Sequence, residues 1–386
     1  MRSIGRAALF AATLACGTAD RSGAGALGEG AQATNPSRAA FPIIGGVVAP
    51  SPTLDHTGAL MYRDRATGEM GPLCTGTLLS PETLVTAKHC IIVLPIFERI
   101  GLEVLFAVGP DHDDPLDLIP VVAVAGAPGD EGGQAGYGRD VGVAHLERPV
   151  VGVTPAVARP FSADLLGVTL VTLGYGVSSA DGAIDGLRRI GRETVEAVSG
   201  SSYEAMFGGF ESFAEWMLTK QSTALDILPT LSDDERTDLE ALYGSGGLLE
   251  QHEAVTGRTP GDTQSCSNDS GGPLALPSRE GGWEVYAVVS AGANSSRSVC
   301  DFGQVFATFG PVTFPFLEAE RQWTDPCGDT DAGGRCDGSV AVRCQTRFDP
   351  AERNRVADDC GARGEVCVVS ASGAACSGSS DDATPP

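Results

Sequence analysis

The middle of the chain carries short apolar runs separated by polar, glycine-containing turns. Gly58–Tyr62 and Gly76–Leu79 are two examples. A third run, Val141–Leu146, alternates between larger apolar and other residues and leads into Pro149, and a fourth, Val285–Gly292, is mostly apolar. Runs of this length bounded by turn residues are typical of β-strands. We therefore predict an all-β domain in this part of the chain.

The range of about residues 200–260 departs from this pattern and favours helices. Ser232 and Glu235 have the spacing of a capping box, and apolar residues follow them at helical intervals. The segment 210–217 is also helix-like. We expect a partly helical insertion within the β domain.

The first sixteen residues have the pattern of an export signal. Arg2 and Arg6 precede an apolar run, Ala7–Ala15, which is too short to span a bilayer. The run ends at Cys16 in a sequence similar to a bacterial lipoprotein signal, in which the cysteine becomes the lipidated N-terminus. Lipidation of Cys16 and plain cleavage with secretion both stay open. Residues 17–42 are rich in small and polar residues and predict a flexible tether or a pro-segment.

Length and charge narrow the classes of function. The chain of 386 residues is longer than one typical domain and carries a net charge of −24. Such a surface repels nucleic acid and anionic lipid, so a lipid on Cys16 is the one expected route to a membrane. The acidity could attract basic polypeptides, but it is also a common route to solubility. The sequence does not indicate an oligomeric state.

The eleven cysteines fall into three groups. Cys16 stands alone, four lie in the β region, and six lie near the C-terminus: Cys327, Cys336, Cys344, Cys360, Cys367 and Cys376. Ten cysteines can pair as disulfides, which implies an oxidising compartment outside the cytoplasm. Residues 324–386 hold few large apolar residues, so we predict a small module held by disulfides of unknown pairing. Zinc is the rival interpretation, but this segment has no CxxC pair and no histidine.

Candidate chemistry centres on Ser270. It lies between Asp269 and two glycines, four residues after Cys266. The glycines let the backbone approach a substrate carbonyl, and the neighbouring N–H groups can bind a developing oxyanion. A serine hydroxyl also needs a base, and a group that orients the base.

The chain supplies both groups upstream of the serine. His89 stands beside Cys90 at the end of an apolar run, and Asp140 opens the run Val141–Leu146. Both are therefore candidates to work with a nucleophile. His145, five residues after Asp140, is expected to be an exposed strand residue.

In the order His89, Asp140, Ser270, these motifs resemble the chymotrypsin/trypsin-like serine proteases over about residues 43–323. The resemblance implies two six-stranded antiparallel β-barrels and a terminal helix at 313–323. It further implies the disulfides Cys74–Cys90 and Cys266–Cys300, and an oxyanion hole made by the N–H groups of Asn268 and Ser270.

The resemblance also implies a specificity pocket, with residues Gln264, Ser290, Gly292 and Gln304. Trypsin has an aspartate where this chain has the neutral Gln264, so a preference for Arg or Lys is not expected. Asn268 stands where the family has glycine, and Lys88 stands where a small residue is common. Both departures could weaken catalysis.

Ile43-Ile44-Gly45-Gly46 resembles the mature N-terminus of the family. The implied chemistry is cleavage before Ile43, which frees an amine that pairs with the carboxylate of Asp269. The bond follows Pro42, so self-activation of the trypsin type is not expected. The alternative is that Ile43 begins the first strand without any cleavage.

We therefore predict an exported serine endopeptidase that acts on polypeptides and is secreted or anchored at the cell envelope. The alternative is an inactive protease-fold binding protein that acts through residues 324–386. That module could bind substrate, wall polymer or another protein, or be a protease-resistant appendage. The insertion either restricts or recruits substrates or is a passive decoration. Asp111–Asp114 is expected to be a solvated loop, with Ca²⁺ binding as the alternative, and no other metal or cofactor is expected.

Overall fold

The computed structural model describes residues 43, 45–129, 138–178, 183–221, 232–293, 300, 302–325, 327, 333–345, 354–370 and 373–378. The predicted signal peptide, the lipidation candidate Cys16 and the tether at 17–42 lie outside these residues. Among the described helices, none is long and apolar enough to cross a membrane.

The first barrel is closed by six antiparallel strands. Their order is β2 (Thr57–Asp64), β3 (Met70–Leu78), β4 (Thr83–Ala87), β7 (Val141–Leu146), β6 (Asp117–Gly126) and β5 (Leu102–Val108), and β5 pairs back onto β2. Leu60, Leu84, Phe106 and Ile119 are fully buried in its interior. Two short helices, α1 (Lys88–Ile91) and α2 (Leu94–Arg99), follow β4.

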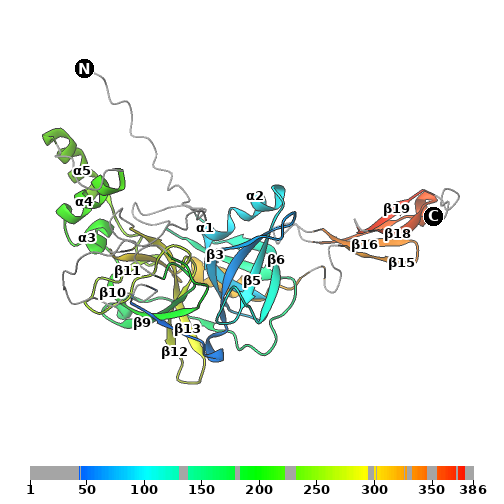
Figure 1. Ribbon diagram of the computed structural model, residues 1–386, viewed down its shortest axis with the longest axis horizontal. Helices are drawn as coiled ribbons and strands as arrows, with labels where there is room; N and C mark the ends of the chain where they lie inside the picture. Colours follow the sequence, from blue (N-terminus) through cyan, green and yellow to red (C-terminus); the bar gives the residue numbers. More distant parts are fainter. Residues whose placement is uncertain are drawn as a thin grey trace, which may run out of the picture. The chain divides into compact units, whose positions relative to one another are not determined.

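The second barrel closes in the same way. Its order is β9 (Thr169–Gly174), β10 (Arg189–Ala197), β11 (Glu253–Thr256), β14 (Gln304–Thr308), β13 (Trp283–Gly292) and β12 (Pro273–Pro277), and β12 pairs with β9. The short strand β1 (Val47–Val48) adds to β10, and β8 (Val157–Ala158) runs parallel to β13. The prediction of two closed six-stranded antiparallel barrels is confirmed (Figure 1).

One apolar cluster joins both barrels and the terminal helix. Val85 and Val143 come from the first barrel, Val288 and Phe309 come from the second, and Leu317 comes from α6 (Thr313–Glu320). The helix confirms the predicted terminal element, although it ends three residues earlier than expected. Burial of this shared cluster stabilises the contact between the barrels, where residues from both can meet.

The expectation that His145 is exposed is wrong. Its side chain on β7 is fully buried and stacks on Trp323, with ring centroids 4.1 Å apart. The two ring nitrogens lie 3.0 Å from Glu320 Oε2 and 3.1 Å from Thr83 Oγ1. The alternation of β7 places this residue outside the barrel core, but the end of the chain's terminal helix covers that face.

The insertion consists of α3 (Ser202–Phe207), α4 (Phe210–Gln221) and α5 (Asp233–Ser245), between β10 and β11 (Figure 1). The predicted capping box is confirmed, because Ser232 N donates to Glu235 Oε2 at 2.9 Å and Glu235 N donates to Ser232 Oγ at 3.4 Å. The helical segment is narrower than 200–260, because Glu253–Thr256 is strand β11 of the barrel.

Arg188 ties the start of the described chain to the second barrel. It is fully buried, one residue before β10. Its guanidinium donates to the carbonyl oxygens of Ala49, Ser51 and Leu54 at 3.1, 2.9 and 2.9 Å, and it pairs with Asp55 Oδ1 at 2.9 Å. A buried guanidinium is costly without such partners, so this segment is held in one position.

The C-terminal module is a small β structure. A sheet of β15 (Arg335–Asp337), β16 (Val340–Gln345) and β17 (Asn354–Asp359) is accompanied by a hairpin of β18 (Val366–Ser370) and β19 (Gly373–Ser377). The disulfides are Cys327–Cys344, Cys336–Cys367 and Cys360–Cys376. All six cysteines are therefore oxidised, which leaves no thiolate for zinc. The module depends on disulfides, as predicted.

Candidate active site

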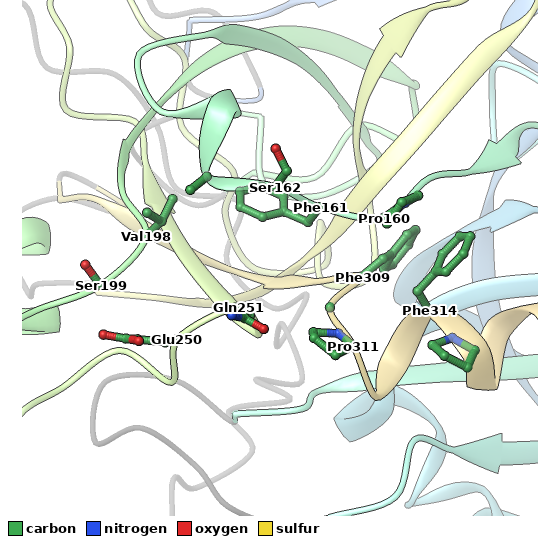
Figure 2. A pocket seen from close by; sticks show the side chains of 13 residues that line it. Pro160, Phe161, Ser162, Val198, Ser199, Glu250, Gln251, Phe309, Pro311 and Phe314 are labelled. Atoms are coloured by element: carbon green, nitrogen blue, oxygen red, sulfur yellow. The ribbon is translucent and has the colours of Figure 1, made fainter.

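A cavity of about 560 Å³ beside the second barrel lies apart from the predicted site residues (Figure 2). Phe161, Phe309 and Phe314 form apolar walls, and Glu250 and Gln251 add polar groups at one end. None of the predicted catalytic or pocket residues lines it. The candidate active site is instead the point where both barrels contribute polar side chains.

His89 is held by the short helix that follows β4. The disulfide Cys74–Cys90 fixes this helix to β3, as the resemblance implied. His89 Nδ1 lies 2.7 Å from Asp140 Oδ2, and the backbone N–H of His89 donates to Asp140 Oδ1 at 2.8 Å. These two contacts fix both the backbone and the ring of His89. They favour the tautomer with the proton on Nδ1, in which the lone pair that can accept a proton lies on Nε2.

Asp140 is only 2% exposed and lies directly before β7. Its Oδ2 also accepts a hydrogen bond from Ser290 Oγ at 2.7 Å. Ser290 lies on β13 of the second barrel, so the carboxylate bridges the barrels. The sequence prediction placed Ser290 in the pocket and missed this contact, because no local pattern links it to Asp140.

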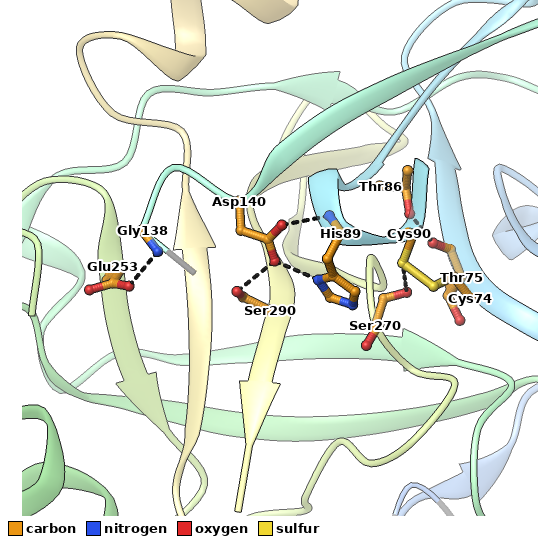
Figure 3. A network of polar contacts seen from close by, with 10 residues as sticks. All are labelled: Cys74, Thr75, Thr86, His89, Cys90, Gly138, Asp140, Glu253, Ser270 and Ser290. Carbon is orange, nitrogen blue, oxygen red and sulfur yellow. Dashed lines mark hydrogen bonds and ion pairs between the residues drawn. A yellow bond between two sulfur atoms is a disulfide. The ribbon is translucent and has the colours of Figure 1, made fainter. Parts of the chain in front are cut away.

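Figure 3 shows Asp140, His89 and Ser270 in a row, with the imidazole between the carboxylate and the serine. Ser270 is half-buried in the loop before β12. Its carbonyl oxygen accepts from Thr75 N at 2.8 Å and lies 3.8 Å from Cys90 Sγ. That sulfur is within 4.8 Å of a ring nitrogen of His89. The structure thus brings the three predicted catalytic residues together.

Two backbone N–H groups at the serine loop have no acceptor within the described part of the chain and so indicate a place where an anion could bind. Three neighbouring N–H groups have partners: Asp269 N donates to Cys266 O, Gly271 N to Val289 O and Gly272 N to Asp269 O. The N–H groups of Asn268 and Ser270 donate to no acceptor among the described residues. Two free donors that flank one aspartate are suited to a developing oxyanion.

Asn268 accommodates the backbone that glycine would otherwise provide. Its φ of 72° is left-handed, a region that asparagine enters more readily than most residues. Its side-chain amide donates to the carbonyl oxygens of Pro72 and Leu73 at 3.2 and 3.3 Å. The side chain is thereby held away from the backbone N–H, so the departure from glycine leaves this turn intact.

Asp269 is fully buried next to the serine. Its oxygens accept from Gly176 N and Cys266 N, both at 2.8 Å. Burial raises the pKa of Asp269 to about 7, although these two N–H groups and the charge of Arg189 lower it. Within the part of the chain that the structure describes, Asp269 forms no ion pair.

Ile43 packs against β10 of the second barrel. It is 1% exposed, and its Cγ2 atom is 3.0 Å from where a Cβ on Gly191 would lie. Gly191 is two residues from Arg189 on β10, and Arg189 pairs with Gly174. A Cβ on Gly174 would collide with Asp269 at 2.0 Å, so Gly174 makes room for the carboxylate. Ile43 thus packs against β10, and the aspartate lies against Gly174 at the end of the neighbouring strand β9.

Two of the predicted pocket residues, Gln264 and Gln304, converge on Gly257. Gln264 Nε2 donates to Gly257 O at 3.2 Å, and Gln304 Cγ lies 3.6 Å from where a Cβ on Gly257 would be. Gln304 is 1% exposed, and its Oε1 fills the space beside Gly292. The disulfide Cys266–Cys300, also implied by the resemblance, closes this region. Both side chains at the floor are neutral amides.

Lys88 does not direct its charge at His89. Its Nζ donates to the carbonyl oxygens of Ala127 and Gly129 at 3.0 and 3.1 Å. These contacts draw the ammonium toward the end of β6. The sequence-based concern that Lys88 disturbs the base is therefore not supported by its position.

Among the described residues, clusters that could hold a metal involve only disulfide-bonded cysteines with His89 or Asp325. A disulfide sulfur is a poor metal ligand, so these clusters are not metal sites. In the Asp111–Asp114 loop, Asp113 N donates to Asp111 Oδ1 at 2.9 Å, which is a local turn contact. The predicted solvated loop and its alternative, calcium binding, both stay untested.

The two closed barrels define a class of fold that is compatible with a trypsin-like protease. No protein-family model and no curated protein matches the chain. The argument for function therefore depends on the geometry of the site.

Proposed function

We propose that the protein is an exported serine endopeptidase in which Ser270 is the nucleophile, His89 the general base and acid, and Asp140 the residue that orients His89. The observation that carries the proposal is the 2.7 Å contact between His89 and Asp140, with Ser270 on the opposite side of the ring (Figure 3). Five disulfides among the described residues agree with an oxidising compartment.

In the proposed reaction, His89 takes the proton of the Ser270 hydroxyl while Ser270 Oγ attacks the peptide carbonyl carbon. The N–H groups of Asn268 and Ser270 hold the oxyanion of the tetrahedral intermediate. His89 then gives its proton to the leaving amine, and an ester on Ser270 remains. Water attacks this ester with the help of His89, which releases the acid and restores the serine. The buried Asp140 stabilises the imidazolium in both steps.

Activation by cleavage before Ile43 belongs to the same proposal. The freed amine would pair with Asp269, whose buried carboxylate has only neutral N–H donors at hydrogen-bond distance. The φ of Ile43 is 30°, which is strained for a β-branched residue. Cleavage of the preceding peptide bond removes this constraint. Both features support processing over an uncut first strand.

The expected substrates are polypeptides with a neutral residue before the scissile bond. Gln264 and Gln304 offer amide groups and no charge to pair with Arg or Lys. An Arg side chain would lose its solvation in this pocket without gaining a carboxylate. We therefore propose that trypsin-like specificity is absent.

The rival function is that of an inactive binding protein. It drew support from Lys88 and Asn268, but the ammonium of Lys88 turns toward Ala127 and the Asn268 turn keeps its N–H free. The C-terminal module remains a proposed site for wall polymer or a protein ligand. Lipidation of Cys16 would anchor the unprocessed chain, and cleavage before Ile43 would release it.

A fluorophosphonate probe that reacts with activated serines tests the proposal. The protein processed to start at Ile43 should be labelled, and Ser270→Ala should not. Ser278→Ala, in the β12–β13 turn, is the matched control and should label like the wild type. Equal labelling of Ser270→Ala, or no labelling of the processed wild type, would contradict the proposed mechanism.

A further inference from the structure

Glu193 is a buried carboxylate that the proposed mechanism leaves without a role. It lies on the inner face of β10 in the second barrel and has no exposed surface. A carboxylate in such a position costs free energy unless hydrogen-bond donors surround it. The residues that donate hydrogen bonds to Glu193 are therefore the ones that it holds in position.

Both oxygens of Glu193 accept hydrogen bonds from residues that flank the proposed pocket. Oε1 accepts from the N–H and the hydroxyl of Ser265, at 3.1 and 2.8 Å. Oε2 accepts from the hydroxyl of Thr256 at 2.5 Å. Ser265 directly follows Gln264, and Thr256 directly precedes Gly257. Since Gln264 donates to Gly257 O, one carboxylate connects the two segments that meet at the pocket floor.

Ser265 lies outside the strands, in the loop between β11 and β12. The next residue, Cys266, donates its N–H to Asp269 Oδ2 at 2.8 Å. Two successive N–H groups of this loop thus end on two buried carboxylates. Asp269 belongs to the serine loop, whereas Glu193 holds Ser265 and Thr256, which are the neighbours of Gln264 and Gly257 in the proposed pocket.

We propose that Glu193 is a positioning residue for substrate selection, which keeps Gln264 and Gly257 at a fixed distance and so preserves the shape of the pocket. The inference rests on the proposed function, because that function assigns the pocket. Glu193 contacts neither the reacting atoms nor the substrate. Its loss is therefore expected to act on substrate binding and preference rather than on the chemical step.

The charge of Glu193 depends on pH in the range where the enzyme would work. Burial raises its pKa to about 7, hydrogen bonds from Thr256 and Ser265 lower it, and the charge of Asp262 raises it. Asp262 accepts from Thr194 N at 2.7 Å, so it is fixed beside the same strand. A protonated Glu193 is a weaker acceptor for the Ser265 N–H. The pocket is expected to loosen as the pH falls below about 7.

The test compares Glu193→Gln with a matched control, Glu196→Gln, in the processed full-length protein. Glu196 lies on the same strand and accepts from Thr259 Oγ1 at 2.9 Å and from the backbone of Arg258, but its side chain forms no hydrogen bond with Thr256 or Ser265 among the described residues. Glutamine keeps the size of the side chain and one acceptor oxygen, so both variants should fold. The substrates are two peptides that differ only in the residue before the scissile bond, leucine in one and arginine in the other.

We expect Glu193→Gln to raise KM for the leucine peptide about tenfold, since it weakens charge-assisted hydrogen bonds at the pocket floor. The ratio of kcat/KM for the leucine peptide to kcat/KM for the arginine peptide should move closer to one. The kcat and the rate of fluorophosphonate labelling at Ser270 should stay within about twofold of the wild type. In the wild type KM should rise between pH 8 and pH 6, and in Glu193→Gln this rise should disappear.

The inference is overturned if Glu193→Gln matches Glu196→Gln in KM, preference and pH dependence. It is also overturned if kcat and labelling fall as much as kcat/KM, because Glu193 would then serve the serine loop. Failure of the proposed function looks different, because the wild type itself would not label. Amide hydrogen exchange decides the inference in that case: the Ser265 N–H should exchange about tenfold faster in Glu193→Gln, and an unchanged rate would refute it.

Discussion

The two barrels supply buried carboxylates to one site, but with different partners. Asp140 from the first barrel accepts from the imidazole of His89, which can become a cation, and from the Ser290 hydroxyl. Glu193 and Asp269 from the second barrel are at least as buried, yet they accept only from neutral N–H and hydroxyl groups. Burial raises the pKa of both to about 7. Burial is the largest cause of both shifts, and the hydrogen-bond donors around the two carboxylates offset it only in part.

The difference implies a division of tasks within the proposed enzyme. The first barrel presents a base that is already oriented. The second barrel presents the serine loop, supported by Asp269, and the pocket, supported by Glu193. The protonation of both carboxylates changes with pH. Asp269 would also pair with the amine that cleavage before Ile43 frees. Substitutions in the two barrels should therefore cause different defects, in catalysis for the catalytic residues and in the pH dependence of stability for the second-barrel carboxylates.

The largest effect is expected from removing the link between the halves. His89→Ala and Ser270→Ala should each lower kcat by about 10⁵ to 10⁶, and the double variant should lose little more, because the two residues act as one unit. Asp140→Asn should lower kcat by about 10⁴, since the imidazole would be held in the wrong tautomer. Steady-state kinetics on a neutral peptide measure all four. Additive losses in the double variant would show that the halves work independently.

The buried carboxylates of the second barrel should make the stability of the protein depend on pH. The raised pKa values mean that the folded state binds protons more tightly than the unfolded state at Glu193 and Asp269. Their contribution is fully present below about pH 4 and is lost as the pH rises through about 7. The shifts correspond to about 3 kcal/mol for Glu193 and about 4 kcal/mol for Asp269. Denaturant unfolding of the unprocessed chain at several pH values measures this slope.

His56 works in the opposite direction, because burial lowers its pKa to about 4, so the comparison must be made between variants. Asp269→Asn and Glu193→Gln should each flatten the pH dependence of the unfolding free energy between pH 5 and pH 8. Cleavage before Ile43 should also reduce the contribution of Asp269 to this pH dependence, because the freed amine would pair with the carboxylate and keep it ionised. An unchanged slope in both variants would mean that these carboxylates are not coupled to folding.

The smallest effect concerns the insertion on the second barrel. Ser232→Ala removes the N-cap of α5 and should lower the free energy of unfolding by about 1 kcal/mol. If the insertion is a passive decoration, kcat/KM should not change. A change in KM would assign the insertion to substrate binding. Thermal unfolding and peptide kinetics on the same sample separate these outcomes.

Local patterns in the sequence predicted strands, and the resemblance to trypsin-like proteases implied the two barrels and the candidate catalytic residues. Apolar runs bounded by glycine-containing turns predicted the strands, and short motifs around His89, Asp140 and Ser270 identified the residues that the fold brings together. The capping box at Ser232 was also visible, because the residues involved are three apart.

What the sequence did not predict depends on contacts between distant segments. The hydrogen bond from Ser290 to Asp140 joins residues 150 positions apart, and the contact between Glu193 and Ser265 spans 72 positions. The burial of His145 requires Trp323 to fold back over β7. Strand β11 has only four residues, too few to show a period within the helical region around it.

The clamp at Arg188 has a consequence for the proposed activation. With the pairing of Val47 and Val48 to β10, it fixes the chain from Val47 onward, which leaves three residues between Ile43 and the fixed segment, a reach of about 14 Å. A newly formed amine would therefore search a small volume around Asp269, at an effective concentration on the order of millimolar or higher. Its capture would be a unimolecular step, independent of protein dilution. A processed molecule would thus remain activated even when it is released into a large extracellular volume.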